Sequence, residues 1–138
     1  MENQNKQASV HSIRNLLSKI FGIVFLLIAC YILINNVFLA DRNESKEAIK
    51  AAESYAISQF YQELGIAVNV KSEIIYDDKD DNRLVAVWYC FDGDSNWQSA
   101  YCVHTKYGVR YNATEMLPMG YNFKQNLNEL KALFGIVG

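Results

Sequence analysis

The chain has 138 residues, of which 51% are hydrophobic and 20% charged, and its formal net charge is −2. This length holds one folded domain of ordinary size, so two independent domains are not expected. Residues 1–19 hold three basic side chains and one acidic one (+2), whereas residues 41–138 hold 10 basic and 14 acidic ones (−4). Because the acidic part contains no basic run, the composition argues against nucleic acid as a partner.

Residues 20–40 form an uncharged and almost wholly apolar run. As a helix with a rise of 1.5 Å per residue it would reach about 31 Å, the thickness of the hydrocarbon layer of a bilayer. Its first four turns lack the polar face of a globular core helix. The run therefore predicts a transmembrane helix at residues 20–40. The alternative is a signal peptide cleaved after Ala40, which is disfavoured because Phe38 stands where a small residue is expected.

The flanking charges predict the orientation of this helix. Arg14 and Lys19 precede the apolar run, and the mixed charges of Asp41, Arg42 and Glu44 follow it. Basic residues favour the cytoplasmic side. We therefore expect a cell-membrane protein with a cytoplasmic tail at residues 1–19 and an extracytoplasmic domain at residues 41–138.

The outer domain begins with a predicted amphipathic helix at residues 43–64. Asp41 and Glu44 are spaced as a capping box, and Gly65 supplies a stop. The apolar positions recur at helical spacing: Ile49, Ala52, Ala56, Phe60 and Leu64. Such a helix is expected to cover a sheet.

Three strands and a final helix are expected next. Residues 66–76 alternate apolar and polar side chains, and residues 83–91 and 97–107 are joined by a loop typical of a hairpin. Residues 109–111 form either a fourth strand or a continuation of the third past a bulge. Asn122 and Gln125 can cap a last helix that ends at Gly135. The expected fold class is α+β, an antiparallel meander of three or four strands with the helices packed on one face.

Cys90 and Cys102 lie in the two hairpin strands and outside the predicted membrane segment. A disulfide is the expected state of such a pair. A register that places the two cysteines directly opposite each other also sets Trp88 opposite His104. Neither cysteine has the further ligands that zinc requires. Cys30 lies in the apolar run, where acylation is a minor alternative.

Two acidic loops contain the D-x-D-x-N pattern that begins a calcium-binding loop. They are Asp78, Asp80 and Asn82 in the first loop and Asp92, Asp94 and Asn96 in the second. Both loops lack the glycine at position six and the glutamate at position twelve of such a site. Aspartate and asparagine are also common turn residues, so we expect turns and no metal.

The sequence offers no catalytic constellation. No nucleophile elbow, zinc-binding helix, C-x-x-C pair or phosphate loop occurs, so neither an enzyme nor a cofactor is expected. His104 is the only histidine after the apolar run, and a disulfide at Cys102 would remove the neighbouring thiol as a nucleophile.

Aromatic residues on the hairpin indicate a binding surface. If the helix covers the face carrying Val85, Val87 and Tyr89, then Trp88 and His104 lie on the opposite face. Together with Trp97 they form the candidate partner surface, unless the terminal helix covers it. We expect an anchored interaction module, an accessory or assembly component of a cell-envelope complex whose partner is another membrane or envelope protein. The alternatives are a secreted inhibitor or immunity-type binding protein released near Ala40 and, less favoured, a small enzyme.

Overall fold

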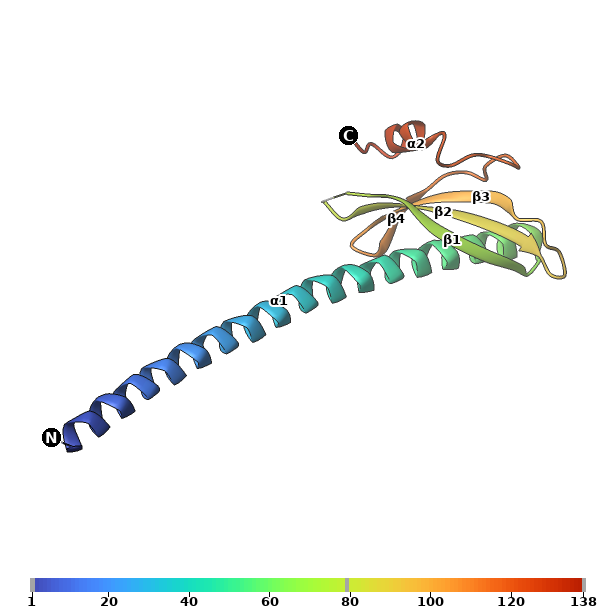
Figure 1. Ribbon diagram of the computed structural model, residues 1–138. Helices are drawn as coiled ribbons and strands as arrows, with labels where there is room; N and C mark the ends of the chain where they lie inside the picture. Colours follow the sequence, from blue (N-terminus) through green and yellow to red (C-terminus); the bar gives the residue numbers. More distant parts are fainter. Residues whose placement is uncertain (1, 79, 138) are drawn as a thin grey trace. The chain divides into compact units, whose positions relative to one another are not determined.

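The computed structural model describes the backbone of residues 2–78 and 80–137 and the side chains of residues 15–78 and 80–137. Its elements, labelled in Figure 1, are α1 (Glu2–Leu64), β1 (Val68–Asp77), β2 (Asn82–Phe91), β3 (Gln98–Lys106), β4 (Val109–Ala113) and α2 (Leu127–Leu133). The chain divides into two compact units, Met1–Asp41 and Arg42–Gly138, and α1 contributes to both. The side chains of Glu2, Lys6 and Arg14, which set the predicted charge of the tail, lie outside the described part.

The helix predicted to begin at residue 43 does not begin there. Residues 41–43 are helical and belong to α1, so the predicted capping box at Asp41 is wrong. The physical reason is that no glycine or proline lies between Gly22 and Gly65, and a helix without such a breaker continues through a polar stretch. The stop at Gly65, with φ of 66°, is confirmed.

The N-terminal part of α1 is apolar and exposed. Among the described residues, one helix is long and apolar enough to cross a membrane, and the most apolar part of it is wholly unburied within the chain. The core helix of a soluble protein would instead be covered by the rest of its domain. A membrane anchor and a signal sequence both have this character.

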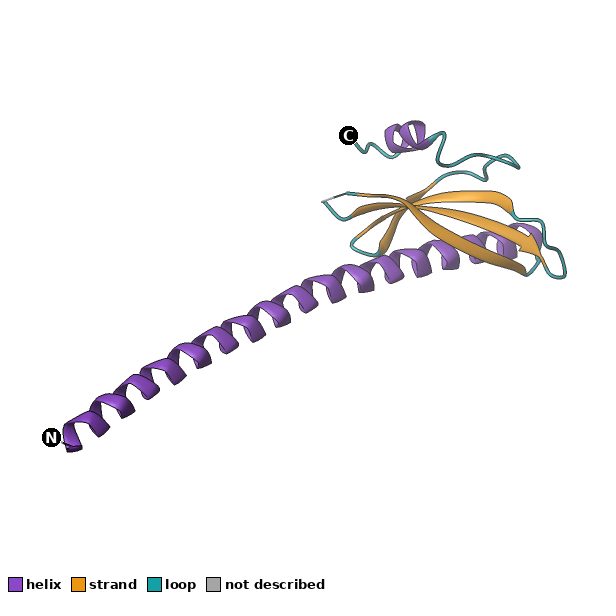
Figure 2. Cartoon of the chain, in the orientation of Figure 1, coloured by secondary structure: helices purple, strands orange, loops and turns teal. Residues whose placement is uncertain are grey.

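The four strands form one antiparallel sheet in the order β1-β2-β3-β4, which confirms the predicted meander (Figure 2). The alternative left open for residues 109–111 is resolved, because β4 is a separate strand. It is joined to β3 by a two-residue turn in which Tyr107 and Gly108 have φ of 54° and 73°, and Lys106 pairs with Val109. Two positive φ angles in succession are typical of a type I′ hairpin turn.

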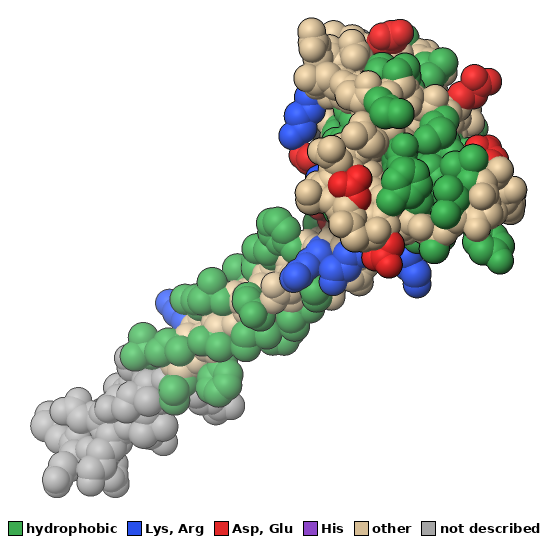
Figure 3. Space-filling view, turned by 90° about the vertical axis from the view of Figure 1, so that its right-hand side faces the viewer, with side chains coloured by type: hydrophobic (Ala, Val, Ile, Leu, Met, Phe, Trp, Pro, Cys, Tyr) green, Lys and Arg blue, Asp and Glu red, His purple; other side chains and the backbone are tan. Residues whose placement is uncertain are grey.

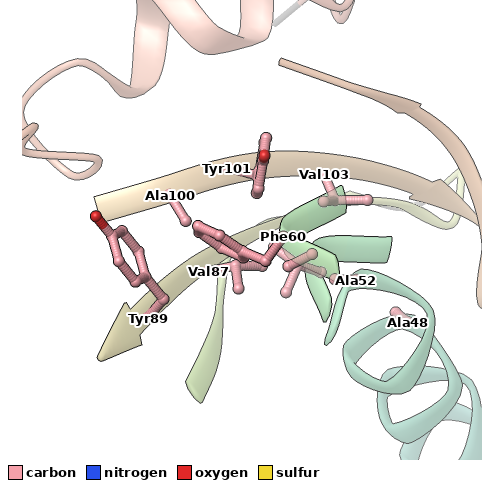
Figure 4. Packing of buried hydrophobic residues seen from close by; sticks show 10 residues of the cluster. Ala48, Ala52, Phe60, Val87, Tyr89, Ala100, Tyr101 and Val103 are labelled. Atoms are coloured by element: carbon pink, nitrogen blue, oxygen red, sulfur yellow. The ribbon is translucent and has the colours of Figure 1, made fainter. Parts of the chain in front are cut away.

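One face of the sheet is covered by α1, as predicted for the face with the tyrosines. Phe60 of α1 packs against Tyr89 and Tyr101, with ring centroids 4.5 and 5.9 Å apart, respectively (Figure 4). Small alanines on the same side of the helix bring its backbone close to the strands. The buried cluster comprises Ala48, Ala52, Ala56, Phe60, Val85, Val87, Tyr89, Ala100, Tyr101 and Val103.

The opposite face is covered by the C-terminal segment that contains α2 (Figure 1). Its buried cluster comprises Leu84, Ala86, Cys102, Phe123 and Leu130. The prediction that both helices pack on one face is therefore wrong. The reason is that β2 and β3 are buried on both faces along most of their length, so each face needs a covering layer.

The predicted cap of the last helix is present, but the helix starts later. The Asn122 Oδ1 atom accepts a hydrogen bond from the backbone N–H of Gln125 at 3.1 Å. The turn so formed precedes α2, which begins only at Leu127. Asn122 therefore orders the approach to the helix.

Arg83 of β2 forms ion pairs with residues of β1 and α1. Its side chain is almost fully buried on β2, and its Nε atom lies 2.9 Å from Asp77 Oδ2 on β1. Its Nη1 atom lies 3.4 Å from Glu44 Oε2 on α1. A buried guanidinium is tolerated only when its donors are paired, so this residue fixes α1 against the sheet.

Candidate interaction site

The predicted disulfide is absent, and the strand register explains why. Cys102 pairs with Ala86 and not with Cys90. Cys90 lies four residues further along β2, which is about 13 Å at the rise of an extended strand. Cysteines so far apart cannot be bridged, and both are buried free thiols.

The register differs because the chain turns earlier than predicted. The backbone N–H of Asp94 donates to the Phe91 carbonyl oxygen at 3.0 Å, and Gly93 between them has φ of 82°. A bulge between Val87 and Trp88 then shifts the pairing once more. Trp88 therefore lies opposite Ser99, and His104 lies opposite Leu84. The predicted pairing of Trp88 with His104 is wrong.

Burial makes Cys102 chemically inert. The side chain belongs to the second core, and burial raises the pKa of its thiol to about 12. A thiol with so high a pKa carries almost no thiolate, which is the nucleophilic form. Cys30, in the apolar part of α1, is exposed.

The two acidic motifs form turns. Asp78 Oδ1 accepts backbone hydrogen bonds from Asp80 and Asn82 at 2.9 and 2.8 Å. In the second loop, Asp94 Oδ1 accepts the backbone N–H of Asn96 at 3.0 Å. Burial acts to raise the pKa of Asp78, but these hydrogen bonds and one from the Asn82 side chain outweigh it and leave the pKa lowered. Within the described residues, no three His, Cys, Asp or Glu side chains are grouped to hold a metal.

His104 is buried, with 4% of its surface exposed, and so lies apart from the predicted partner surface. Its Nε2 atom lies 3.0 Å from Asn82 Oδ1, while Asn82 Nδ2 donates to Asp78 Oδ2 at 3.0 Å. The carboxylate orients the amide, so Nε2 of His104 carries the proton and donates. Nδ1 has no hydrogen-bond partner among the described residues. Burial lowers the pKa of His104, and Lys106 adds to this effect against the opposing charge of Asp78.

Trp88 and Trp97 meet in one cleft. Trp88 is half-buried, and its ring contacts Phe123 with the centroids 5.0 Å apart. The terminal segment therefore covers Trp88 in part, which was the alternative left open by the sequence. Trp97 remains exposed at 38%. The Lys71 Nζ atom lies 4.4 Å from the Trp97 ring centroid and 5.8 Å from that of Trp88.

The tryptophan cleft has a volume of about 370 Å³ and a mixed lining. Its walls are Glu73, Trp88, Trp97, Ser99, Gly120, Tyr121, Asn122, Phe123 and Lys124. At its rim Lys124 Nζ lies 2.8 Å from Glu73 Oε1, and both side chains are exposed. The cleft thus combines aromatic rings with an exposed ion pair. This combination suits the binding of a protein surface, because an aromatic anchor can be surrounded by polar contacts.

The sequence indicated the tryptophans of this cleft but not their companions. Lys71 and Glu73 come from β1, whereas Tyr121 and Lys124 come from the segment before α2. Nothing in the spacing of these residues brings them to one place, because cover of this face by the terminal helix was only one of two alternatives and named none of these side chains. Comparisons with protein-family models, with curated proteins and with solved structures found no match.

Proposed function

We propose that this protein is a membrane-anchored interaction module and that the tryptophan cleft receives its partner, another membrane or envelope protein. The exposed apolar part of α1 supports the anchor, since such a surface needs a lipid or protein environment. The charges that flank residues 20–40 favour a cytoplasmic amino terminus and an extracytoplasmic domain.

The observation that carries the proposal is the meeting of Trp88 and Trp97 in one cleft. Trp88 is fixed by Phe123, whereas Trp97 is exposed and stacked on Lys71. A ring already held in place loses little conformational entropy when it docks. Tryptophan is also enriched among residues that dominate binding energy. We assign Trp97 as the contact residue and Trp88 as its support.

Cross-linking in intact cells followed by a pull-down from detergent-solubilised membranes tests this assignment. Trp97→Ala should weaken partner binding by about 30-fold, as expected from a hot-spot loss of about 2 kcal/mol. Tyr61→Ala is the matched control, because Tyr61 is an exposed aromatic residue on α1 and does not line the cleft. If the wild-type chain and Trp97→Ala recover the partner equally, the tryptophan cleft is not the binding surface.

The anchor is tested separately by washing membranes with carbonate and high salt. A chain that spans the bilayer stays in the membrane fraction, and its C-terminal unit is cut by protease added outside. The alternative of a released inhibitor or immunity-type protein predicts a mature amino terminus near Asp41, which intact-mass measurement would reveal. That result would overturn the anchor and leave the cleft as the binding surface of a free protein.

A further inference from the structure

The tip of the β3–β4 hairpin exposes aromatic and basic side chains together. Tyr107 and Tyr111 are 60% and 72% exposed, and Val109 between them is also exposed. Arg110 lies over the Tyr55 ring of α1 at 4.1 Å, and Lys106 Nζ lies 5.5 Å from the Tyr107 ring centroid. Tyrosine is enriched at the headgroup level of membranes, where lysine and arginine meet lipid phosphates.

This tip lies against the first turns of the helix in the C-terminal unit. A Cβ atom on Gly108 would come within 2.8 Å of Glu47 Cβ and 3.3 Å of the Glu44 carbonyl oxygen. Glu44 follows Ala40, the end of the apolar run, by only four residues. Four residues span at most about 14 Å even when fully extended. The covalent chain therefore limits how far Glu44, which the hairpin tip contacts, can lie from the end of the apolar run.

Positive charge accumulates in the same region of an otherwise acidic unit. Residues 41–50 and 106–111 carry five basic side chains: Arg42, Lys46, Lys50, Lys106 and Arg110. The same stretches carry three acidic side chains, and one of these, Glu44, pairs with the buried Arg83. Figure 3 shows Lys and Arg side chains gathered along one edge of the C-terminal unit. Such an excess attracts a surface of opposite charge within a Debye length, about 8–10 Å.

We propose that the β3–β4 hairpin and the start of the helix beside it form a docking surface for anionic lipid headgroups. Tyr107, Val109 and Tyr111 enter the headgroup layer, while Lys46, Lys50, Lys106 and Arg110 bind lipid phosphates. The surface holds the domain against the bilayer that the apolar run crosses. The inference rests on the proposed membrane anchor, because it is the anchor that brings the hairpin to a bilayer.

Tyrosine footprinting of the full chain in lipid nanodiscs tests the docking surface. The discs contain either phosphatidylcholine alone or equal parts of phosphatidylcholine and phosphatidylglycerol, and hydroxyl radicals label exposed tyrosines. Tyr61, 69% exposed, is the internal reference for Tyr107 and Tyr111. We expect Tyr107 and Tyr111 to be labelled several-fold less than Tyr61 in the anionic discs, and as strongly as Tyr61 in the neutral ones.

Charge variants make the test specific. Lys46→Gln/Lys50→Gln removes two exposed cations and should shift the docking equilibrium by roughly 30-fold, at about 1 kcal/mol for each cation. Lys124→Gln/Lys131→Gln removes two cations outside the hairpin region and should keep the protection. Strong labelling of Tyr107 and Tyr111 in anionic discs overturns the docking surface. Protection of both tyrosines that is independent of lipid charge also overturns it, because such protection indicates contact with protein. Carbonate extraction of the same samples is the separate test, because release of the chain overturns the anchor instead.

Discussion

The hydroxyl group of Tyr101 is expected to oppose folding. The side chain is buried between α1 and the sheet, and its oxygen has no hydrogen-bond partner among the described residues. Burial, with Glu63 second, raises the pKa of the phenol to about 12, so it stays neutral in the physiological range. A buried hydroxyl group without a partner costs about 1–3 kcal/mol.

We therefore predict that Tyr101→Phe keeps or increases the free energy of unfolding, by up to about 1 kcal/mol. The ring contacts with Tyr55 and Phe60 remain in this variant. Chemical denaturation of the full chain in detergent measures the change, and Tyr101→Ala is the comparison, which should lose about 3–5 kcal/mol because it leaves a cavity. A clear loss of stability in Tyr101→Phe would mean that the hydroxyl group has a partner.

The buried thiols give a second prediction at this scale. Cys90 and Cys102 should resist alkylation in the folded chain, because both are buried and burial holds the pKa of Cys102 at about 12. After unfolding without a reducing agent, both should react, as free thiols do. Mass spectrometry counts the modified cysteines. Failure of the unfolded chain to react at these two positions would show the disulfide that the register forbids.

At the scale of elements, the β3–β4 turn illustrates how one glycine sets the spacing between a hairpin and a helix. Gly108→Ala should lower the free energy of unfolding by about 1–3 kcal/mol, from the strain of a positive φ and the contact with Glu47. Gly93→Ala is the matched control, because Gly93 also has a positive φ but its Cβ would meet open space. Denaturant titration should show the larger loss for Gly108→Ala. Equal losses would contradict the close contact with α1.

The strands were predictable and their exact pairing was not. Alternation of apolar side chains placed Tyr89 and Trp88 on opposite faces, and the structure agrees. Pairing depends on where the chain turns, and Gly93 with Asp94 turns it before the position that a cysteine bridge requires. A disulfide argument from spacing therefore needs the geometry of the turn as well. The continuity of α1 was also missed. Asp41 and Glu44 have the spacing of a capping box, but this spacing does not interrupt a helix that runs through both residues.

At the scale of the whole molecule, the stability of the C-terminal unit should depend on pH through His104. Burial holds the folded pKa of this residue below its usual value of 6.5. As the pH falls, His104 is therefore protonated in the unfolded chain before it is protonated in the folded one. The stabilisation that comes from neutral His104 is complete above pH 6.5 and is lost as the pH falls below it. The groups that face the ring are Asp78, Asn82, Lys106, Tyr111 and Phe134.

Unfolding of the full chain measured between pH 7.5 and 5 (about the range in which histidine titrates) tests this dependence. We predict that the free energy of unfolding falls with pH in the wild type and falls less steeply in His104→Gln. The carboxylates do not account for a difference between the two proteins, because they titrate lower. An equal pH dependence of the free energy of unfolding in the wild type and in His104→Gln would mean that groups other than His104 cause it.

The candidate site was predictable only in its two tryptophans. Trp88 and Trp97 stand out by residue type, but Glu73 and Lys124 are ordinary surface residues until the segment before α2 brings them together. His104 was placed on the same surface, yet the shifted register and the cover of Phe134 bury it. A terminal segment packs on whichever sheet face is still apolar and uncovered. That β2 and β3 are buried on both faces became apparent only from the fold, so the position of this segment could not be derived from the sequence.

The covering of the second sheet face by the segment around α2 sets an order in which this part of the protein can assemble during synthesis. Leu130, Phe134 and Ile136 all contact that face, and they are synthesised after the four strands. Until then α1 and the four strands can assemble with Leu84, Ala86 and Cys102 still open to water. The nascent domain thus carries an unprotected apolar surface from the completion of β3 until the segment around α2 emerges. A chain released before the segment around α2 is made would expose an aggregation-prone sheet face, so the covering by this segment is a late step in the assembly of the domain.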